Sequence, residues 1–370
     1  MKAGELSPRP GEAVSVWRRY IELPRYLRTV SGKPNLIATL EQLSSSLGFE
    51  RLAIASGTTF TLGLAESLAS ELSQAHGSPI AIAGNGVADV RSLASARQLA
   101  QADALVAVGG GKTIDVAKSA CDVTDRPVIV VPTQLSADGI ASPVSVLRTE
   151  SGALESRRAR LPIAVCVDLE VIGGASAERT RAGLGDLLAN PGAVRDWRLA
   201  AAAGGEEVDD FAALLAQAAA NVVVGTDVSA LGAGRLETSF LERLLEGLVL
   251  SGLAMEIAGS SRPCSGAEHL ISHALDELRP GTAHHGEQVA FGALVSARLQ
   301  GADTSELRAL MLSAGMDRAA RGFGLPPEAL IEAVRAAPAT RPGRYTVLDE
   351  ADLGEGSLRA VLDEVILRGS

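Results

Sequence analysis

Short apolar runs alternate with longer amphipathic segments over residues 51–170. The runs expected to form strands are RLAIAS (51–56), PIAIAG (79–84), DALVAVGGG (103–111) and PVIVVPT (127–133). Between them, apolar residues recur at the spacing of one helix face, which predicts helices at residues 59–75, 87–102 and 113–122. Strands that alternate with helices in this way predict right-handed βαβ units and a parallel sheet. Residues 20–30 can add a further strand that leads into a helix at residues 36–47.

The pattern changes after about residue 178, where β-branched runs give way to Leu- and Ala-rich helical segments. The expected helices lie at residues 180–203, 206–232, 235–259, 265–278, 285–300, 304–322, 326–336 and 355–368. We therefore predict an α/β domain with a Rossmann-like parallel sheet in residues 1–178. An all-α domain is predicted in residues 179–370. Small-molecule sites commonly lie in the cleft between two such domains.

Composition narrows the class of function. The chain has a net charge of −10 and no basic run, which argues against a nucleic-acid partner. No stretch reaches the ~18 uncharged apolar residues that a membrane span needs. The three cysteines are scattered, and the first 20 residues lack the apolar core of a signal peptide. These features favour a cytoplasmic protein that acts on a small molecule.

Three consecutive glycines, Gly109, Gly110 and Gly111, stand between an expected strand and an expected helix. Because they have no side chains, backbone N–H groups can approach a ligand closely, and the helix N-terminus favours an anion. The pattern suggests a cradle for a pyrophosphate, although it matches neither the GxGxxG fingerprint nor a P-loop. A plain tight turn explains the glycines equally well.

Four of the five histidines lie within residues 265–288. His269 and His273 are four residues apart, so they share one face of a helix. Pro280 and Gly281 would end that helix and let the chain turn back, which brings His285 close to the first pair.

A divalent metal bound by two of these histidines would usually also need a carboxylate, and the candidate is Asp186 in GLGDLLAN (183–190). The alternative is that the histidines are surface or helix-capping residues. The clustering favours a metal or catalytic site, with His284 as a bystander because adjacent side chains diverge.

Seven stretches, taken together, resemble the iron-containing alcohol dehydrogenase superfamily, which includes dehydroquinate synthase-like enzymes. The stretches are GGGKTIDVAK (109–118), VPTQLSADGIASP (131–143), LPIAVCVDLEVI (161–172), GLGDLLANPGAVRDW (183–197), AGSSRPCSGAEHLISHALD (258–276), HGEQVAFG (285–292) and RPGRYTVL (341–348). Within the superfamily they are most similar to the branch that acts on sn-glycerol 1-phosphate. The resemblance covers roughly residues 20–350.

This resemblance implies a dehydroquinate synthase-like fold, NAD(H) or NADP(H) as the coenzyme, and one divalent metal. It implies that Asp186, His269 and His285 ligate the metal. Asn190 stands where iron alcohol dehydrogenases carry a further histidine, which favours a three-ligand set with zinc or nickel rather than iron. Three protein ligands would leave an open position for a substrate oxygen.

The resemblance also assigns roles around the ligand set. It puts Gly109, Gly110, Gly111 and Asp115 near the pyrophosphate of the coenzyme. Thr133, Ser136 and Asp138 would lie by the nicotinamide and the substrate.

Three side chains have a second interpretation each. Asp138 would bond a substrate hydroxyl, or else form an Asx turn before Gly139. His273 would relay a proton, or else make a second-shell hydrogen bond. Arg262 would bind a substrate phosphate, or else form a structural salt bridge.

The expected function is a metal-dependent NAD(P)H oxidoreductase that interconverts dihydroxyacetone phosphate and sn-glycerol 1-phosphate or a close analogue, and we expect it to be a homo-oligomer. Ala137 replaces a histidine of the family motif, so the alternative is the same chemistry on another polyol, sugar or cyclitol phosphate in secondary metabolism. A cyclase like dehydroquinate synthase is disfavoured, because that family uses several active-site lysines and this chain has only four. A non-catalytic binding protein is disfavoured because the three ligand positions are intact.

Overall fold

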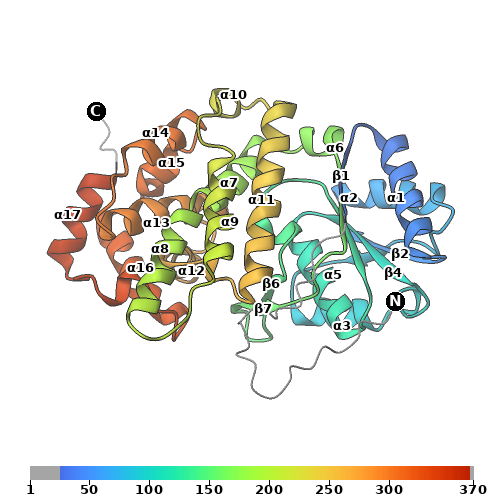
Figure 1. Cartoon of the computed structure of the whole chain (residues 1–370), viewed down its shortest axis with the longest axis horizontal. Coiled ribbons are helices and arrows are strands. Elements are labelled where there is room, and N and C mark those ends of the chain that lie inside the picture. The colour runs from blue at the N-terminus through green and yellow to red at the C-terminus, as the bar shows by residue number, and fades with distance from the viewer. Residues whose placement is uncertain (1–25, 367–370) are drawn as a thin grey trace, which may run out of the picture.

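Six parallel strands form the core of the N-terminal half of the computed structural model, which describes residues 26–366 (Figure 1). The strands are β1 (Tyr26–Val30), β2 (Leu52–Gly57), β3 (Ile80–Ile82), β4 (Ala104–Gly109), β5 (Val128–Pro132) and β8 (Ala164–Asp168). Their order across the sheet is β1–β8–β5–β4–β2–β3. Strands β4, β5 and β8 are buried along their whole length, as expected of a parallel sheet covered on both faces.

Alternate residues of the central strands β2, β4 and β5 point into two different cores. One face, which carries Ile54 and Val106, packs against α1 (Lys33–Leu47) and α2 (Phe60–Glu71). The other face belongs to a larger core that continues from α3 (Val87–Ala94) and α5 (Gly111–Val123) into the C-terminal half. A single apolar core therefore joins the sheet to the helices beyond it.

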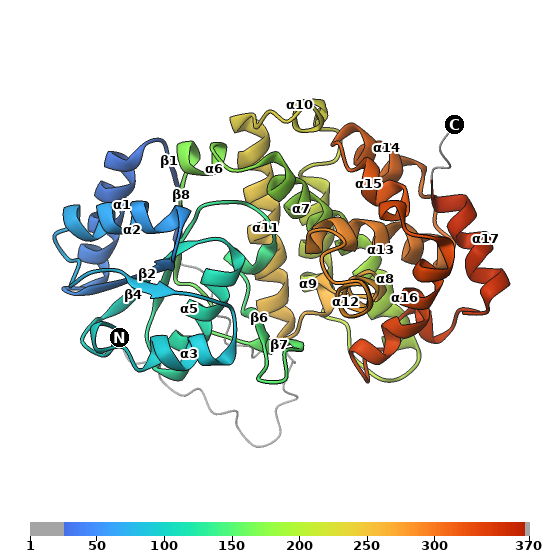
Figure 2. The same cartoon turned by 180° about the vertical axis from the view of Figure 1, so that it is seen from behind.

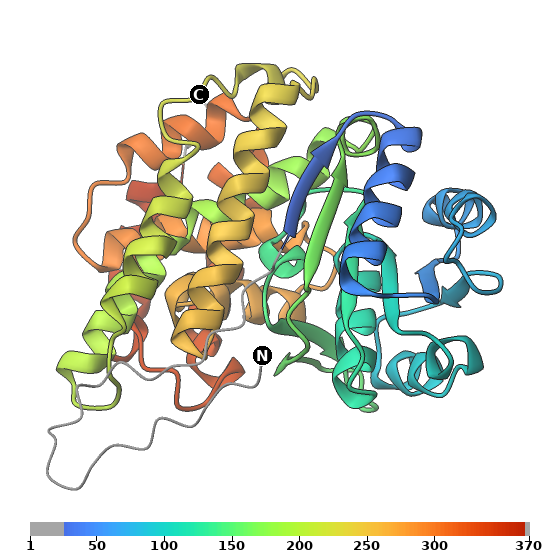
Figure 3. The same cartoon turned by 45° about the vertical axis from the view of Figure 1, so that its right-hand side comes forward.

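Helices make up the C-terminal half of the described chain (Figure 2). They are α7 (Ala177–Leu188), α8 (Asn190–Ala202), α9 (Asp210–Asn221), α10 (Ser229–Gly232), α11 (Thr238–Ala258), α12 (Ala267–Leu278), α13 (His285–Leu299), α14 (Ser305–Ser313), α15 (Asp317–Ala320), α16 (Pro327–Thr340) and α17 (Glu355–Val365). The long helix α11 stands between the sheet and the other helices (Figure 3). Among the described helices, none combines the length and the apolar character that crossing a membrane requires.

Several short elements complete the chain. They are α4 (Arg97–Ala100), α6 (Leu169–Gly173), the antiparallel hairpin of β6 (Val144–Arg148) and β7 (Leu154–Arg158), and the 3₁₀ turns η1 (Asp138–Ile140), η2 (Arg262–Cys264), η3 (Gly322–Gly324) and η4 (Val347–Asp349). Turn η1 follows β5 directly, and η2 lies between α11 and α12. These two turns flank the site described below.

The predicted fold class is confirmed, and some element boundaries were wrong. The expected helix at 87–102 is interrupted between α3 and α4, and the one at 180–203 is interrupted at Ala189. Pro191 is the second residue of α8, in the first turn of that helix, where its missing N–H costs nothing. Residues 20–25 of the expected first strand and 367–368 of the last helix lie outside the described residues. The domain boundary at 178/179 stays a prediction, and it falls inside α7.

Candidate active site

Three side chains from three helices converge at one point. Asp186 belongs to α7, His269 to α12, and His285 is the first residue of α13. Each offers one ligand atom, and these atoms all lie within 4.8 Å of one another. His269 Nε2 is 3.3 Å from Asp186 Oδ1, and the two imidazole centroids are 5.3 Å apart. The residues predicted as metal ligands are thus brought together.

Glycines allow these helices to approach so closely. A Cβ added at Gly286 would lie 1.8 Å from the carbonyl oxygen of Ala182, and one at Gly185 would lie 2.1 Å from the carbonyl oxygen of Gly286. Helices α7 and α13 are therefore in backbone contact next to Asp186. On the other side of α7, a Cβ at Gly183 would lie 2.1 Å from the carbonyl oxygen of Leu135.

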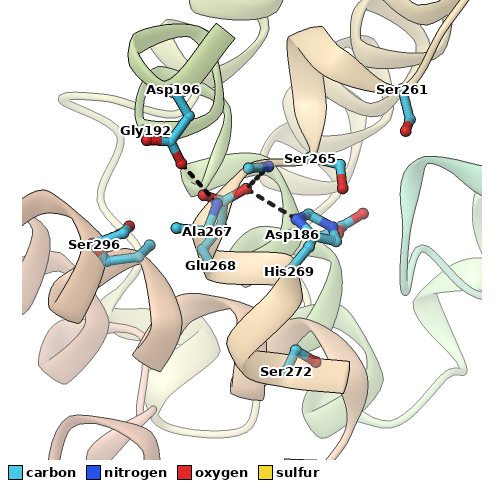
Figure 4. Close-up of polar contacts among 12 residues, drawn as sticks. Asp186, Gly192, Asp196, Ser261, Ser265, Ala267, Glu268, His269, Ser272 and Ser296 are labelled. Carbon is cyan, nitrogen blue, oxygen red and sulfur yellow. Dashed lines mark hydrogen bonds and ion pairs between the residues drawn. The ribbon is translucent and has the colours of Figure 1, made fainter. Parts of the chain in front are cut away.

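The charges around His269 suit a divalent cation. Its Nδ1 lies 3.1 Å from Oε1 of Glu268, a fully buried carboxylate (Figure 4). Burial opposes protonation of His269, but hydrogen bonds with Asp186 and Glu268 raise its pKa to about 10. Burial and the charge of Asp186 raise the pKa of Asp138 well above its usual range. An imidazolium thus balances buried carboxylates, and a bound divalent ion would supply that positive charge directly.

His285 is oriented by a chain of hydrogen bonds that the sequence analysis missed. Its Nδ1 lies 3.0 Å from Ser272 Oγ, which donates to Gln288 Oε1 at 3.0 Å. The amide nitrogen of Gln288 donates to Asp276 Oδ1 at 3.1 Å. Since the Ser272 proton is used toward Gln288, Ser272 Oγ accepts the proton of His285 Nδ1. Nε2 of His285 is then the nitrogen with a free lone pair, as a metal ligand requires.

The segment after β5 connects this cluster to the sheet. Thr133 is buried at the end of β5, and its amide donates to Gly109 O at 3.0 Å. Ser136 accepts a hydrogen bond from Gln134 at 3.2 Å. The amide of Asp138 donates to Asp186 Oδ2 at 3.0 Å. Asp138 and Asp186, two of the predicted acidic site residues, therefore lie side by side.

The glycine turn lies where strand order reverses. From β2 the chain goes outward to β3 and then returns to β4 on the other side of β2. Ligands of open α/β sheets bind at the carboxyl ends of strands at such a point. A Cβ at Gly110 would lie 2.6 Å from Gln134 Nε2, whereas nothing lies within 4 Å of one at Gly111. Open space thus faces the first turn of α5, whose unbonded N–H groups suit a pyrophosphate.

Asp115 and Lys118 form a buried pair beneath this region. Lys118 Nζ is 3.3 Å from Asp115 Oδ1 and donates to the carbonyl oxygens of Gly139 and Ser142, at 2.7 and 3.1 Å. Asp115 Oδ2 accepts from the amide of Val146 at 3.1 Å. The pair fastens the segment that follows η1. The coenzyme contact of Asp115 stays a prediction.

The remaining histidines of the window differ in environment. His273 lies on α12 with its ring 6.0 Å from that of His285. Burial, followed by the positive charges of His285, His269, Arg341 and Arg344, lowers its pKa to about 3. His284 Nε2 lies 3.3 Å from Oε1 of Glu178, and His284 is not one of the three residues whose ligand atoms converge.

Arg262 is held by other protein groups. Its Nε and Nη2 both bond the carboxylate of Glu206, and its Nη1 donates to the carbonyl oxygen of Tyr345 at 2.7 Å. Arg341 and Arg344, which are partly buried next to it, were not predicted as site residues. The signal that could have found them is the RPGR tetrapeptide of the motif at 341–348.

Asn190 has no role in the ligand cluster. It is buried, and its amide nitrogen donates to Ser251 Oγ at 2.7 Å and to the carbonyl oxygen of Ala216 at 3.2 Å. These bonds tie α8 to α9 and α11. Its side chain is therefore engaged between helices.

Known proteins resemble the chain in sequence and in fold. A model of the family described as "Iron-containing alcohol dehydrogenase" matches residues 31–175. The NAD(P)⁺ glycerol-1-phosphate dehydrogenase of Pyrobaculum neutrophilum is 36% identical over 94% of this chain and 98% of its own length. The enzyme of the same name from Cenarchaeum symbiosum is 41% identical over 72% of this chain and 75% of its own length. The structure of a probable glycerol dehydrogenase from Sinorhizobium meliloti superposes with a TM-score of 0.70 at 26% identity, covering 94% of this chain and 98% of that one.

Proposed function

The chain belongs to the iron-containing alcohol dehydrogenase family, and we propose that it interconverts dihydroxyacetone phosphate and sn-glycerol 1-phosphate, or a close analogue, with NAD(H) or NADP(H). The observation that carries this proposal is the convergence of Asp186, His269 and His285 beside residues 133–138. This segment contacts the glycine turn at Thr133 and Asp186 at Asp138. The substrate is proposed from the names of the two relatives, which match 94% and 72% of this chain.

Asp186, His269 and His285 would hold one divalent ion. Zinc or nickel is proposed because Asn190, whose amide bonds Ser251 and Ala216, stands where iron alcohol dehydrogenases carry a further histidine. Such an ion, when bound, acts as a Lewis acid toward a substrate oxygen. The chain's own contribution is to orient the donors. Glu268 aligns His269 and Ser272 aligns His285, while the amide of Asp138 fixes the second oxygen of Asp186.

Gly109, Gly110 and Gly111 are proposed to carry the coenzyme pyrophosphate at the start of α5. Thr133 and Ser136 lie on the loop after β5, between the glycine turn and Asp186 in space, and would then lie along the nicotinamide. When bound, the coenzyme supplies or accepts the hydride. The proposal covers both NAD(H) and NADP(H).

Asp138 and His273 are proposed to handle the proton and the substrate hydroxyl. Burial keeps the Asp138 carboxyl protonated to a higher pH than usual, so it can donate to a substrate oxygen. His273 stays neutral because its pKa is about 3, and a neutral imidazole can accept a proton at one nitrogen and give one up at the other. Its second possible role, orienting His285, requires no proton transfer.

The test follows NADH and NADPH oxidation at 340 nm with dihydroxyacetone phosphate, using chelator-treated protein with Zn²⁺, Ni²⁺ or Fe²⁺ added back. We expect turnover that depends on added metal and that Asp186→Asn abolishes. The matched control is Asp122→Asn, which changes an exposed aspartate of α5 and should leave turnover unchanged. No turnover with any metal, while the coenzyme still binds, would exclude this substrate.

Ala137 favours one alternative substrate class. It precedes η1 beside Asp138, where the family motif has a histidine, so a different hydroxyl pattern could be accommodated. A screen of other phosphorylated ketones and polyols with the same assay would identify it. We also propose a cytoplasmic setting, since the three cysteines are all unpaired and buried, and a homo-oligomeric assembly that light scattering would test.

A further inference from the structure

Three arginines gather where α11, η2 and the segment after α16 meet. Arg262 is paired with Glu206, as described above. Arg341 and Arg344 instead bond a serine, because Nη1 of Arg341 and Nη2 of Arg344 each lie 3.0 Å from Ser261 Oγ. Within residues 26–366, no carboxylate lies at ion-pair distance from either of these two guanidinium groups.

The charge of this cluster is poorly compensated. Burial, followed by the positive charges of Arg341 and Arg262, lowers the pKa of Arg344 to about 9. Burial and Arg262 lower the pKa of Arg341 as well. Of the carboxylates among the described residues, Glu206 pairs with Arg262, and Glu206 and Glu268 act on Arg344 only as more distant charges with smaller effects than the two neighbouring arginines. A dianion between Arg341 and Arg344 would relieve this repulsion and accept hydrogen bonds from both guanidinium groups.

Space for such an anion is present next to the cluster. A cavity of about 220 Å³ is lined by Arg341, Ser260 and Ser261 on the helical side and by Arg157 and Arg158 of β7 on the side of the hairpin. The cavity therefore lies between the hairpin and the helices. Its wall offers cations and hydroxyls to a ligand.

The cluster is also close to the proposed metal ligands. The positive charges of Arg341 and Arg344 act on His273, whose ring stacks 6.0 Å from that of His285. Ser265, whose carbonyl oxygen accepts from Arg344 Nη1 at 2.7 Å, lies one helical turn before His269. Figure 4 shows Ser261 and Ser265 on the same side of α12 as Asp186 and His269.

We propose that Arg341 and Arg344, positioned by Ser261, bind the phosphate monoester of the substrate while its oxygen-bearing carbon lies at Asp186, His269 and His285. This inference rests on the proposed function for the identity of the substrate and extends it by naming the phosphate site. Arginine suits the task because its planar fork bonds two phosphate oxygens at once. Arg262 donates to the carbonyl oxygen of Tyr345, the residue after Arg344, and so helps to hold this segment in place.

The test measures binding of inorganic phosphate to the metal-loaded enzyme by calorimetry, and KM and kcat with dihydroxyacetone phosphate. We expect Arg341→Gln and Arg344→Gln each to weaken phosphate binding and raise KM at least about tenfold, with a smaller change in kcat. Arg344→Lys should retain part of the affinity. Arg321→Gln, which removes an exposed arginine, should change neither quantity.

Two further measurements are needed. One shows whether each variant is folded, and the other shows whether the bound phosphate belongs to the substrate or to the coenzyme. Arg344 also bonds the Ser265 carbonyl, so circular dichroism and thermal unfolding accompany each variant. Arg341→Gln keeps the test decisive if Arg344→Gln fails to fold, because within residues 26–366 the Arg341 guanidinium bonds Ser261 alone. Unchanged phosphate binding in folded Arg341→Gln would overturn the proposal. The proposal would also be overturned if the variants lost affinity for NADPH but not for NADH. Arg341 and Arg344 would then bind the 2′-phosphate of the coenzyme instead of the substrate phosphate.

Failure of the proposed function gives a different result. If dihydroxyacetone phosphate is not turned over with any metal but phosphate binding still depends on Arg341 and Arg344, the anion site stands and the substrate is another phosphate ester. If turnover is found and both variants keep the wild-type KM, the function stands and the anion site is wrong.

Discussion

Ser272 Oγ lies 3.0 Å from Nδ1 of His285 and fixes which imidazole nitrogen is free. Ser272 donates to Gln288 and Gln288 donates to Asp276, so the only bond left between Ser272 and His285 is one that His285 Nδ1 donates. Because the chain ends at a carboxylate, which only accepts when ionised, the tautomer of His285 is set without any ion present.

Removing this serine hydroxyl is expected to weaken metal binding. Ser272→Ala should raise the Kd of zinc about 10- to 100-fold, because His285 loses the partner that selects its tautomer. Competition against a chromophoric chelator measures this Kd directly. Ring ¹⁵N shifts of the metal-free protein should also show a mixed tautomer at His285. Ser296→Ala is the control, since that buried hydroxyl bonds only the carbonyl of Ala293 in its own helix. An equal effect of both variants would contradict the prediction.

Adding a methyl group at Gly286 should separate α7 from α13. A Cβ there would meet the carbonyl oxygen of Ala182 at 1.8 Å, and backbone cannot move aside as a flexible side chain does. We expect Gly286→Ala to lower the free energy of unfolding by at least about 2 kcal/mol and to weaken metal binding. Urea denaturation and the chelator assay measure the two effects.

Gly63→Ala provides the matched control for that variant. Gly63 lies in α2, and a Cβ there would have nothing within 4 Å, so alanine should be neutral or stabilise by up to about 1 kcal/mol. If Gly286→Ala proves as stable as Gly63→Ala, the two helices are not in the close contact described.

Asp196 is expected to make stability depend on pH. Its Oδ2 accepts from the amide of Ala267 at 2.7 Å, and Figure 4 shows Glu268 between it and His269. Burial and the charge of Glu268 raise its pKa from 3.8 to about 6. The folded protein therefore binds this proton more tightly than the unfolded chain does. The resulting stabilisation, on the order of 3 kcal/mol, is fully present below pH 3.8 and is lost as pH rises through about 6.

Urea denaturation between pH 4.5 and 8 tests this sign. Relative to the Asp122→Asn control, Asp196→Asn should flatten the fall in stability between pH 4.5 and about 6, because Asn cannot ionise. The hydrogen bonds that Asp196 accepts from Val347 and Gln300 add a loss that is independent of pH. A pH slope identical in the two variants would show that Asp196 titrates at its ordinary value.

Lys118 should be essential for the stability of the fold, although it is not one of the residues proposed to contact the substrate or the metal. Lys118→Met would remove the donor shared by the carbonyls of Gly139 and Ser142 and leave Asp115 buried without its cation. We expect a loss of about 3–5 kcal/mol in unfolding free energy at pH 7. Lys112→Met, which changes an exposed lysine of the same helix, should cost less than about 0.5 kcal/mol. Comparable losses would argue that Lys118 is not the anchor of this segment.

The sequence predicted the alternation of strands and helices well because both periodicities were strong. It did not predict β8, whose run AVCVD was recognised only as part of a motif, or the hairpin of β6 and β7. Strand β7 is largely exposed and carries arginines and a glutamate, so it lacks the apolar signal of a buried strand. Helix 87–102 was predicted as continuous because the interruption at Ser95 and Ala96 contains neither Gly nor Pro.

The site residues likewise divide into those that the sequence could predict and those that it could not. Asp186, His269 and His285 could be proposed because ligand types are chemically restricted and two of them share a short window. Ser272, Gln288 and Asp276 could not, because nothing in a serine, glutamine and aspartate on neighbouring turns distinguishes a hydrogen-bond chain from an ordinary helix surface. Arg341 and Arg344 lie about 70 residues from His273 in sequence, and only the packing of α16 against α12 reveals their proximity.

The backbone contacts of Gly183 and Gly252 have a consequence for building chimeras. Gly183 of α7 packs on the carbonyl of Leu135, and Gly252 of α11 packs on that of Ala141. The segment between β5 and β6 is therefore in direct backbone contact with both helices. A domain exchange cut at 178/179 would pair helices from one protein with a loop fitted to another. A functional hybrid must therefore inherit residues 133–141 from the donor of its helical half, together with that half.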